Sequence, residues 1–194
     1  MKIMFVCTGN TCRSAMAEGL AKKIIKEKNL DIEVYSAGIF AMNGEHASYN
    51  SVAIMKEYDV DLALHTATSI ENSEIEKMDL ILCATKNHKA QLISRYSDEK
   101  EKIFTMKEYA GLDNNGQDMD ISDPWGYNMN TYRMYAAEIS LCVDKIIEKL
   151  TINNKIIKKF LLPGEEACVI FPYVKGSKIY SFCNKHGLWS KEVE

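Results

Sequence analysis

The residues with the clearest chemical potential form a short loop near the N-terminus, Cys7–Ser14 (CTGNTCRS). Five residues separate Cys7 from Arg13, which pairs a nucleophilic sulfur with a planar guanidinium that can bind two phosphate oxygens at once. Gly9 lets the backbone turn inward, so that successive N–H groups can face the same oxygens. The positive end of a following helix would stabilise both a bound phosphoryl group and a thiolate. The loop therefore predicts a phosphate site whose nucleophile is Cys7.

The other loop residues would support this site. Ser14 can donate its hydroxyl to the sulfur of Cys7 and can cap the following helix, and Asn10 can brace the loop through its side-chain amide. The residues expected around a bound substrate are Thr8, Gly9, Asn10, Thr11, Cys12 and Ser14. An alternative is that Cys7 is a buried cysteine at a strand end and Arg13 a surface helix residue, because this spacing often occurs by chance.

Breaking a phosphoryl bond also requires a group that protonates the leaving atom and later activates water. The best candidate is Asp123 in the segment Ser122–Gly126 (SDPWG), because Pro124 restrains the backbone beside it. Asp118 and Asp120 are rivals on composition alone. Asp-Pro pairs also commonly form a turn before a helix, and spacing alone favours neither role for Asp123.

Apolar runs and helical stripes indicate an alternating pattern of strands and helices. Strands are expected at Lys2–Val6, Ile32–Ser36, Asp79–Ala84 and Lys102–Thr105. Helices are expected after Ser14, near residues 47–58, at Lys86–Arg95 and at Asn128–Leu150. This alternation is typical of an α/β fold with a doubly wound, parallel four-stranded sheet flanked by helices. Such sheets carry their sites at the carboxyl ends of the strands, where Cys7 lies.

The character of the chain changes after Leu150. Residues 151–194 contain two of the three prolines and seven lysines against four glutamates, whereas the whole chain has a net charge of −3. Strand-like pieces at Ala167–Phe171 and Lys178–Phe182 flank a turn. We therefore expect one domain over residues 1–150 and a small appended C-terminal β-rich segment, of unassigned role, over residues 151–194.

Composition narrows the classes of function. Hydrophobic residues make up 46% of the chain and charged residues 26%, as in ordinary globular proteins. The net charge of −3 gives no basis for binding nucleic acid, and no apolar run is long enough to cross a membrane. We expect a cytoplasmic protein, a monomer or weak oligomer, with no cofactor, no metal and mostly free thiols. Cys168, Cys183 and His186 do not have the spacing of a zinc site.

Three segments resemble the low-molecular-weight protein tyrosine phosphatases: residues 1–19 (MKIMFVCTGNTCRSAMAEG), Ser36–Gly38 (SAG) and Ser122–Gly126. The resemblance runs in order along the expected first domain and has no counterpart for the tail. It implies a protein phosphatase that forms a phosphocysteine on Cys7, holds the phosphate with Arg13 and uses Asp123 as acid and base. It thereby favours the catalytic role for Asp123, and it implies phosphorylated proteins as substrates.

Within that family, the loop is most similar to the bacterial protein-arginine phosphatases. These enzymes have threonine where Thr11 stands, whereas tyrosine-specific members usually carry a bulky aliphatic residue there. The small hydroxyl of Thr11 leaves room for the flat, polar guanidinium of phosphoarginine. Thr85 also favours phosphoarginine, because the eukaryotic tyrosine enzymes tend to have an acidic residue near this place. Phe40 and Trp125 would form the cleft walls that sandwich this group. Phosphoarginine is thus the expected substrate, and phosphotyrosine is the alternative.

The resemblance also implies a redox role for Cys12. In the family, a cysteine at this place can form a disulfide with the nucleophile, which would protect Cys7 from irreversible oxidation. Cys83 suggests the related thioredoxin-linked arsenate reductases, but the second relay cysteine is missing. Burial in the core is the better account of Cys83 and of Cys142. A non-catalytic phospho-residue binder is a further alternative.

The histidines are assigned by their positions. Family members often have a histidine near His65, which implies that this residue orients the phosphate loop. His46 and His88 are expected to be solvated.

Overall fold

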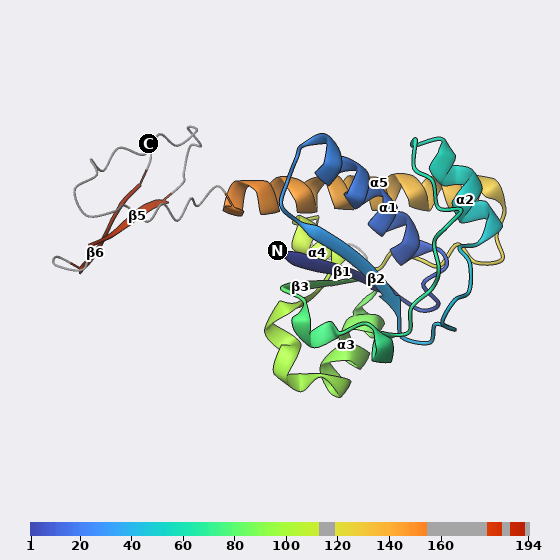
Figure 1. Ribbon diagram of the computed structural model, residues 1–194, viewed down its shortest axis with the longest axis horizontal. Coiled ribbons are helices and arrows are strands. Elements are labelled where there is room, and N and C mark those ends of the chain that lie inside the picture. The colour runs from blue at the N-terminus through green and yellow to red at the C-terminus, as the bar shows by residue number, and fades with distance from the viewer. Residues whose placement is uncertain (113–118, 155–177, 184–186, 193–194) are drawn as a thin grey trace. The chain divides into compact units, whose positions relative to one another are not determined.

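The computed structural model describes residues 1–112, 119–154, 178–183 and 187–192, and the chain divides into two compact units, Met1–Ile152 and Asn153–Glu194 (Figure 1). The first unit is built around a parallel four-stranded sheet with the strand order β2-β1-β3-β4. The strands are β1 (Lys2–Cys7), β2 (Glu33–Gly38), β3 (Leu80–Cys83) and β4 (Ile103–Thr105). This arrangement confirms the expected sheet, with β1 between β2 and β3.

Helices cover both faces of this sheet. They are α1 (Arg13–Glu27), α2 (Tyr49–Lys56), α3 (Lys86–Arg95), α4 (Met106–Ala110) and α5 (Met129–Asn154), with short 3-10 helices at Ile70–Asn72, Ile75–Lys77 and Ser97–Lys102. Figure 1 shows α1 and α5 on one face of the sheet and α3 on the other. The doubly wound arrangement predicted from the sequence is therefore present.

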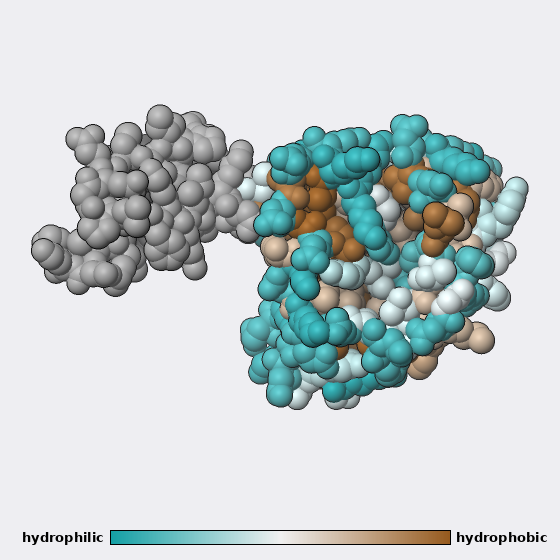
Figure 2. All heavy atoms as spheres, viewed as in Figure 1, coloured by the Kyte–Doolittle hydropathy of each residue, from teal (hydrophilic) through white to brown (hydrophobic). Residues whose placement is uncertain are grey.

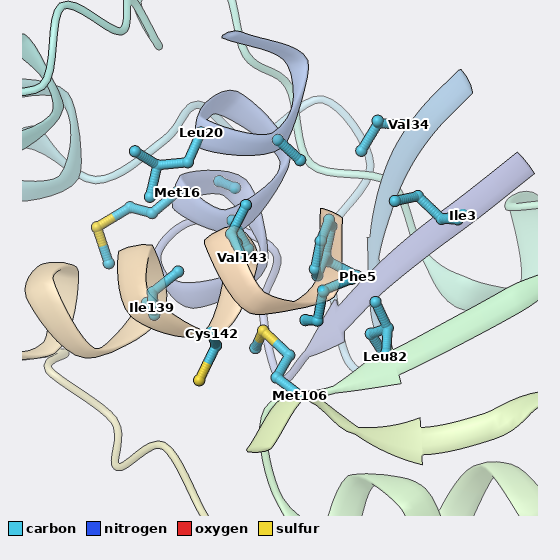
Figure 3. Close-up of a cluster of buried hydrophobic side chains, with 14 of the residues drawn as sticks. Ile3, Phe5, Met16, Leu20, Val34, Leu82, Met106, Ile139, Cys142 and Val143 are labelled. Atoms are coloured by element: carbon cyan, nitrogen blue, oxygen red, sulfur yellow. The ribbon is translucent and has the colours of Figure 1, made fainter. Parts of the chain in front are cut away.

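The alternation of side chains along β1 explains why both faces need a cover. Ile3 and Phe5 belong to the core beneath α1 and α5, whereas Met4 and Val6 belong to the core beneath α3, and all four are buried. Figure 3 shows the first of these cores, to which the helices contribute Met16, Leu20, Ile139, Cys142 and Val143. A strand buried on both faces is a continuous apolar run, which is why the sequence identified β1 so directly.

The parallel register brings the ends of two strands together at the phosphate loop. Cys7, the last residue of β1, pairs with Gly38, the last residue of β2. A Cβ atom at Gly38 would lie 2.6 Å from the carbonyl oxygen of Thr8 and 2.9 Å from the amide nitrogen of Asn10. Only glycine lets β2 end this close to the loop, so the SAG segment meets a steric requirement of the site.

Several boundaries differ from the predicted ones by a few residues, and α2 is about two residues shorter at each end than the predicted 47–58. β2 continues to Gly38, past the expected end at Ser36, because its last residues pair with the end of β1. α5 continues to Asn154, past the expected end at Leu150. Local patterns mark where an element lies, whereas pairing partners decide where it ends.

The start of α1 also differs from the prediction. The helix begins at Arg13, with Cys12 at its N-cap and no side-chain cap. The prediction that Ser14 caps this helix is wrong, because Ser14 lies within the first helical turn and its hydroxyl faces Cys7. Ser14 therefore contacts the sulfur of Cys7 and does not cap the N-terminus of α1.

The described part of the second unit contains an antiparallel pair of strands, β5 (Lys178–Cys183) and β6 (Gly187–Glu192). β5 confirms the strand expected at Lys178–Phe182, whereas the sequence pattern did not predict β6. The other predicted strand, Ala167–Phe171, lies outside the described residues.

The surface of the first unit is mainly hydrophilic on the face shown in Figure 2, with apolar areas of limited extent between polar side chains. Within the part of the chain that the structure describes, no helix combines the length and apolar character needed to cross a membrane. Large apolar side chains that are exposed include Phe40, Tyr49, Leu64 and Trp125. Two of them, Phe40 and Trp125, are the residues expected to form the cleft walls.

Candidate active site

A cleft of about 270 Å³ opens beside the loop that follows β1. Its lining residues are Cys7, Thr8, Gly9, Thr11, Cys12, Arg13, Glu45, Asp123 and Trp125. The phosphate loop and the Asp123 segment, which are far apart in the sequence, therefore meet at one cleft. Its volume suits a single phosphorylated side chain.

The nucleophile candidate Cys7 is buried, and its Sγ atom lies 3.0 Å from Ser14 Oγ. Ser14 Oγ accepts a hydrogen bond from Asn10 Nδ2 at 2.8 Å, and its own hydroxyl hydrogen can be donated to the sulfur or, over the longer distance of 3.4 Å, to the carbonyl oxygen of Ala37. A hydroxyl donor and the N-terminus of α1 both stabilise negative charge on sulfur. Cys7 is therefore in an environment that suits a thiolate nucleophile.

Asn10 holds the loop from behind. Its backbone φ of 57° lies in the left-handed region, and its side chain donates to Ser36 Oγ at 2.7 Å and accepts from the Thr68 amide at 2.8 Å. His65 Nε2 lies 2.8 Å from the carbonyl oxygen of Asn10, which agrees with its expected role in orienting the loop. Asn10 and Ser14 are fully buried and are not among the residues that line the cleft, and their side chains hold the loop in place.

The guanidinium of Arg13 is buried and held by three acceptors. It donates to Ile121 O and Thr8 Oγ1, each at 3.1 Å, and to Asp123 Oδ2 at 2.5 Å. Its Nε atom is buried without a partner among the described residues. A buried N–H of this kind is rare in proteins, and here it is well suited to bind an anionic oxygen.

Asp123 connects the phosphate loop to the segment before α5. One of its oxygens pairs with Arg13, the other accepts from the Trp125 amide at 3.2 Å, and the side chain is 45% exposed. Asp120 Oδ1 instead accepts from the first backbone N–H of α3 at 2.7 Å, and Asp118 lies outside the described residues. Of Asp120 and Asp123, it is Asp123 that lines the cleft.

The rim of the cleft differs from the expected one. Trp125 lines it and is 71% exposed, as a wall residue should be. Phe40 is not among the lining residues, because its 63% exposed ring lies instead 5.5 Å from the guanidinium of Arg95. Glu45 lines the cleft although no sequence motif marks it, and its carbonyl oxygen is tied to the Ala67 amide at 2.7 Å.

His88 is buried, so the prediction that it is solvated is wrong. Its Nε2 atom lies 3.0 Å from Thr8 Oγ1, and its Nδ1 atom lies 2.8 Å from Thr85 Oγ1. Thr85 caps α3 by accepting from the His88 amide and does not line the cleft. Burial, together with the neighbouring Arg13 cation, lowers the pKa of His88 to about 4, so the ring is neutral at neutral pH. His46 is exposed, as expected.

Cys12, the candidate redox partner of Cys7, lines the cleft as a free thiol. Its Sγ atom lies 3.3 Å from Ser48 Oγ and 3.3 Å from Tyr132 OH. Burial is the main reason that the pKa of Tyr132 is raised to about 12, so its hydroxyl stays protonated beside the sulfur. Both cysteines of the proposed redox pair are thus reduced and border the same cleft.

The other described thiols lie in the core. Cys83 and Cys142 are fully buried, and burial raises the pKa of Cys83 and raises that of Cys142 to about 12. Both therefore fit unreactive core residues. Among the side chains that the structure describes, no three His, Cys, Asp or Glu residues gather as metal ligands, and Cys168 and His186 lie outside that part.

The fold and its cleft are those of a phosphatase that uses a cysteine nucleophile. Residues 2–156 match the low molecular weight phosphotyrosine protein phosphatase family, and the chain belongs to this family. The match covers the whole four-stranded sheet and helices α1 to α5. The family expected from the sequence motifs is therefore confirmed, and the chain is a phosphatase.

Two relatives and one solved structure illustrate the relationship. A protein-arginine-phosphatase of Geobacillus stearothermophilus is 37% identical over 150 residues, which cover 77% of this chain and 95% of the relative. A low molecular weight protein-tyrosine-phosphatase PtpB of Staphylococcus haemolyticus is 36% identical over 146 residues, which cover 75% and 97%. The solved structure is that of a YwlE arginine phosphatase mutant with a phosphorylated active-site serine in place of cysteine. It is 33% identical to this chain with a TM-score of 0.73, and the match covers 80% of this chain and 99% of the solved chain. The expected similarity to protein-arginine phosphatases is thus confirmed.

Proposed function

We propose that this phosphatase hydrolyses phosphoarginine in proteins, and the observation that carries the proposal is the position of Thr11. Thr11 lines the cleft and is 9% exposed, so it borders the space that a substrate would occupy. Threonine leaves more room than a bulky aliphatic residue, and its hydroxyl can hydrogen-bond to a guanidinium nitrogen. The similarity to the Geobacillus protein-arginine-phosphatase supports the same substrate.

The charge of the cleft lining also supports phosphoarginine. The Asp123 carboxylate is paired with Arg13, whereas Glu45 has no ion pair within the described part of the chain. An unpaired negative charge opposes the binding of a phosphate dianion unless the substrate carries a positive charge beside it. The guanidinium of phosphoarginine supplies that positive charge, and the ring of phosphotyrosine does not.

The proposed reaction begins with attack of the Cys7 thiolate on phosphorus, in line with the leaving group. The loop N–H groups and Arg13 stabilise the charge on the other phosphoryl oxygens. As the S–P bond forms, the P–N bond breaks and its electron pair stays on the guanidino nitrogen. Asp123, in its protonated form, gives this nitrogen its proton. The product of the first step is a phosphocysteine on Cys7.

In the second step, water attacks the phosphocysteine while the Asp123 carboxylate takes one of its protons. The S–P bond breaks, the thiolate is regenerated and inorganic phosphate leaves, so Asp123 is again protonated for the next cycle. Because Asp123 pairs with Arg13 in the structure, a phosphoryl group that competes for this guanidinium would release the carboxyl group toward the leaving nitrogen. The loop and Arg13 supply the charge stabilisation, so this mechanism uses no cofactor and no metal.

Phosphotyrosine is the second candidate substrate, and the family description and the PtpB relative favour it.

An arsenate reductase relay is disfavoured, because Cys83 is buried in the core and Ala90 and its neighbours provide no second cysteine. The non-catalytic binder loses its support, since members of the family are phosphatases. Turnover of a generic aryl phosphate by the purified protein tests that last point.

We also propose that the substrates are phosphorylated proteins of the cytoplasm and that the enzyme is a monomer or weak oligomer. The four free thiols in the described part fit a reducing compartment. The net charge of −3 gives no reason to expect nucleic acid or a membrane surface as a partner.

Thr11→Ile should shift the preference from phosphoarginine toward phosphotyrosine. Isoleucine removes the hydroxyl and fills the space beside the loop, which should lower kcat/KM for phosphoarginine about tenfold, the usual effect of one lost hydrogen bond. The measurement compares kcat/KM on matched phosphoarginine and phosphotyrosine peptides. Thr11→Ser, which keeps the hydroxyl, is the control. Far faster hydrolysis of phosphotyrosine by the wild type would remove the arginine assignment.

Cys12 should decide whether inactivation by peroxide is reversible. Peroxide converts the Cys7 thiolate to a sulfenic acid, and the Cys12 thiol then displaces water from it to form a disulfide. Wild type treated with peroxide should regain activity in a thiol reductant, whereas Cys12→Ser should lose most of its activity permanently. Cys142→Ser, at a core thiol, should behave like wild type. Full recovery of Cys12→Ser would contradict the protective role.

A further inference from the structure

A chain of hydrogen bonds behind the phosphate loop links Arg13 to helix α3. Arg13 Nη2 donates to Thr8 Oγ1 at 3.1 Å, Thr8 Oγ1 lies 3.0 Å from His88 Nε2, and His88 Nδ1 lies 2.8 Å from Thr85 Oγ1. Both Arg13 and His88 are buried. The contacts of this buried imidazole therefore lead directly to the guanidinium that binds phosphate.

The tautomer of His88 that we assign carries the proton on Nδ1, and the donors and acceptors around the ring accommodate it. Arginine can only donate, so Thr8 Oγ1 accepts from Arg13, and the Thr8 hydroxyl hydrogen is left for His88 Nε2. Nε2 is then the acceptor, and Nδ1 donates to Thr85 Oγ1. Thr85 Oγ1 also accepts from the His88 backbone amide at 3.2 Å, which uses its second lone pair. A neutral ring protonated at Nδ1 thus gives a partner to both ring nitrogens and to the Thr8 hydroxyl hydrogen.

The Thr8 contact gains importance during catalysis. Arg13 has three acceptors in the structure, and the proposed mechanism takes Asp123 away from it to serve the leaving group. Ile121 O and Thr8 Oγ1 then remain as the protein acceptors of the guanidinium. A Thr8 hydroxyl that rotated freely could turn its hydrogen toward Arg13 and repel it. Nε2 of His88 prevents this by holding that hydrogen on the other side of the oxygen.

We infer that His88 is a positioning residue for phosphate binding, which acts as a neutral acceptor to orient Thr8 and, through Thr8, Arg13. The charge state of the ring agrees with this role. Burial and the Arg13 cation lower the pKa of His88, and a protonated ring would lose its acceptor and add a second cation next to Arg13. This role holds for either substrate, so its test is independent of the choice between phosphoarginine and phosphotyrosine.

His88→Leu removes both ring nitrogens and tests the inference. It should weaken inhibition by inorganic phosphate about tenfold and lower kcat/KM for an aryl phosphate to a similar extent, as the loss of one hydrogen bond predicts. His88→Gln should retain most of the phosphate inhibition and most of the kcat/KM, because its amide oxygen can accept a hydrogen bond from Thr8. Leu92→Ala, at a buried residue of the same helix outside the chain, is the matched control and should leave phosphate inhibition unchanged.

A double-mutant cycle separates positioning from packing. In a Thr8→Val background, His88→Leu should have little further effect on phosphate inhibition, because the histidine acts through the Thr8 hydroxyl. Equal losses in both backgrounds, or an equal loss in Leu92→Ala, would overturn the inference. If His88→Leu does not fold, Thr85→Val decides the matter. It removes the partner of Nδ1 and should weaken phosphate inhibition severalfold, and unchanged inhibition would count equally against the inference.

Discussion

Cys7→Ser should lower the turnover of an aryl phosphate by at least about a thousandfold, while inorganic phosphate still binds. Serine has a similar size, but its hydroxyl is not ionised at neutral pH, so the nucleophile is lost. The loop amides and Arg13 remain in place, which is why phosphate binding should persist. Steady-state kinetics and titration calorimetry with inorganic phosphate measure the two quantities separately.

The control for this variant is Cys142→Ala, which removes a buried thiol on α5 far from the loop in sequence. It should reduce stability through the cavity it creates but keep the turnover of each folded molecule. Rapid acid quenching of the wild type during turnover should also trap one phosphoryl group on a peptide containing Cys7. Turnover of Cys7→Ser within tenfold of wild type would show that another residue is the nucleophile.

Asp123→Asn should slow turnover by about 10²- to 10⁴-fold, the range expected when a general acid is lost. Asparagine can still accept a hydrogen bond from Arg13, but it cannot protonate the leaving group or activate water. Phosphate inhibition should be unchanged or tighter, because the competing carboxylate charge is gone from Arg13. The loss should shrink with aryl phosphates whose leaving groups need no proton, and a series of such substrates measures this trend.

Asp120→Asn is the matched control for the acid. Asp120 accepts from the first N–H of α3, and an asparagine oxygen can do the same, so this variant should stay close to wild type. If Asp120→Asn were slowed more than Asp123→Asn, the two aspartates would exchange roles. A loss in Asp123→Asn that did not depend on the leaving group would argue against general acid catalysis by this residue.

Much of the fold was predictable because its signals are local. The sheet strands are buried, so they appear as short apolar runs, and α1 shows an apolar stripe at helical spacing. The candidate site was predictable in part for the same reason, since Cys7–Ser14 contains a cysteine, an arginine and a turn in one continuous segment, and Cys7 and Arg13 both line the cleft. Asp123 needed the family resemblance, because it reaches Arg13 only through the tertiary fold.

The remaining features depend on contacts between distant segments. His88 lies on a helix of mainly polar residues, yet it is buried and contacts Thr8, eighty residues earlier in the chain. Glu45 enters the cleft lining in a loop tied by a backbone hydrogen bond to Ala67, which has no signature in the sequence. Phe40 follows the SAG segment closely, but its ring faces Arg95 on α3. Spacing along one chain cannot show such pairings.

The tight approach of Gly38 to the phosphate loop limits how this enzyme can acquire new substrates in evolution. Any side chain at Gly38 would collide with the backbone of Thr8 and Asn10, so strand and loop can only change together. Glu45 and Trp125 are exposed on the cleft lining and have no such restriction. Descendants of this sequence should therefore diverge at these lining positions and at Thr11, while the other residues of the loop proposed to perform the chemistry are inherited unchanged.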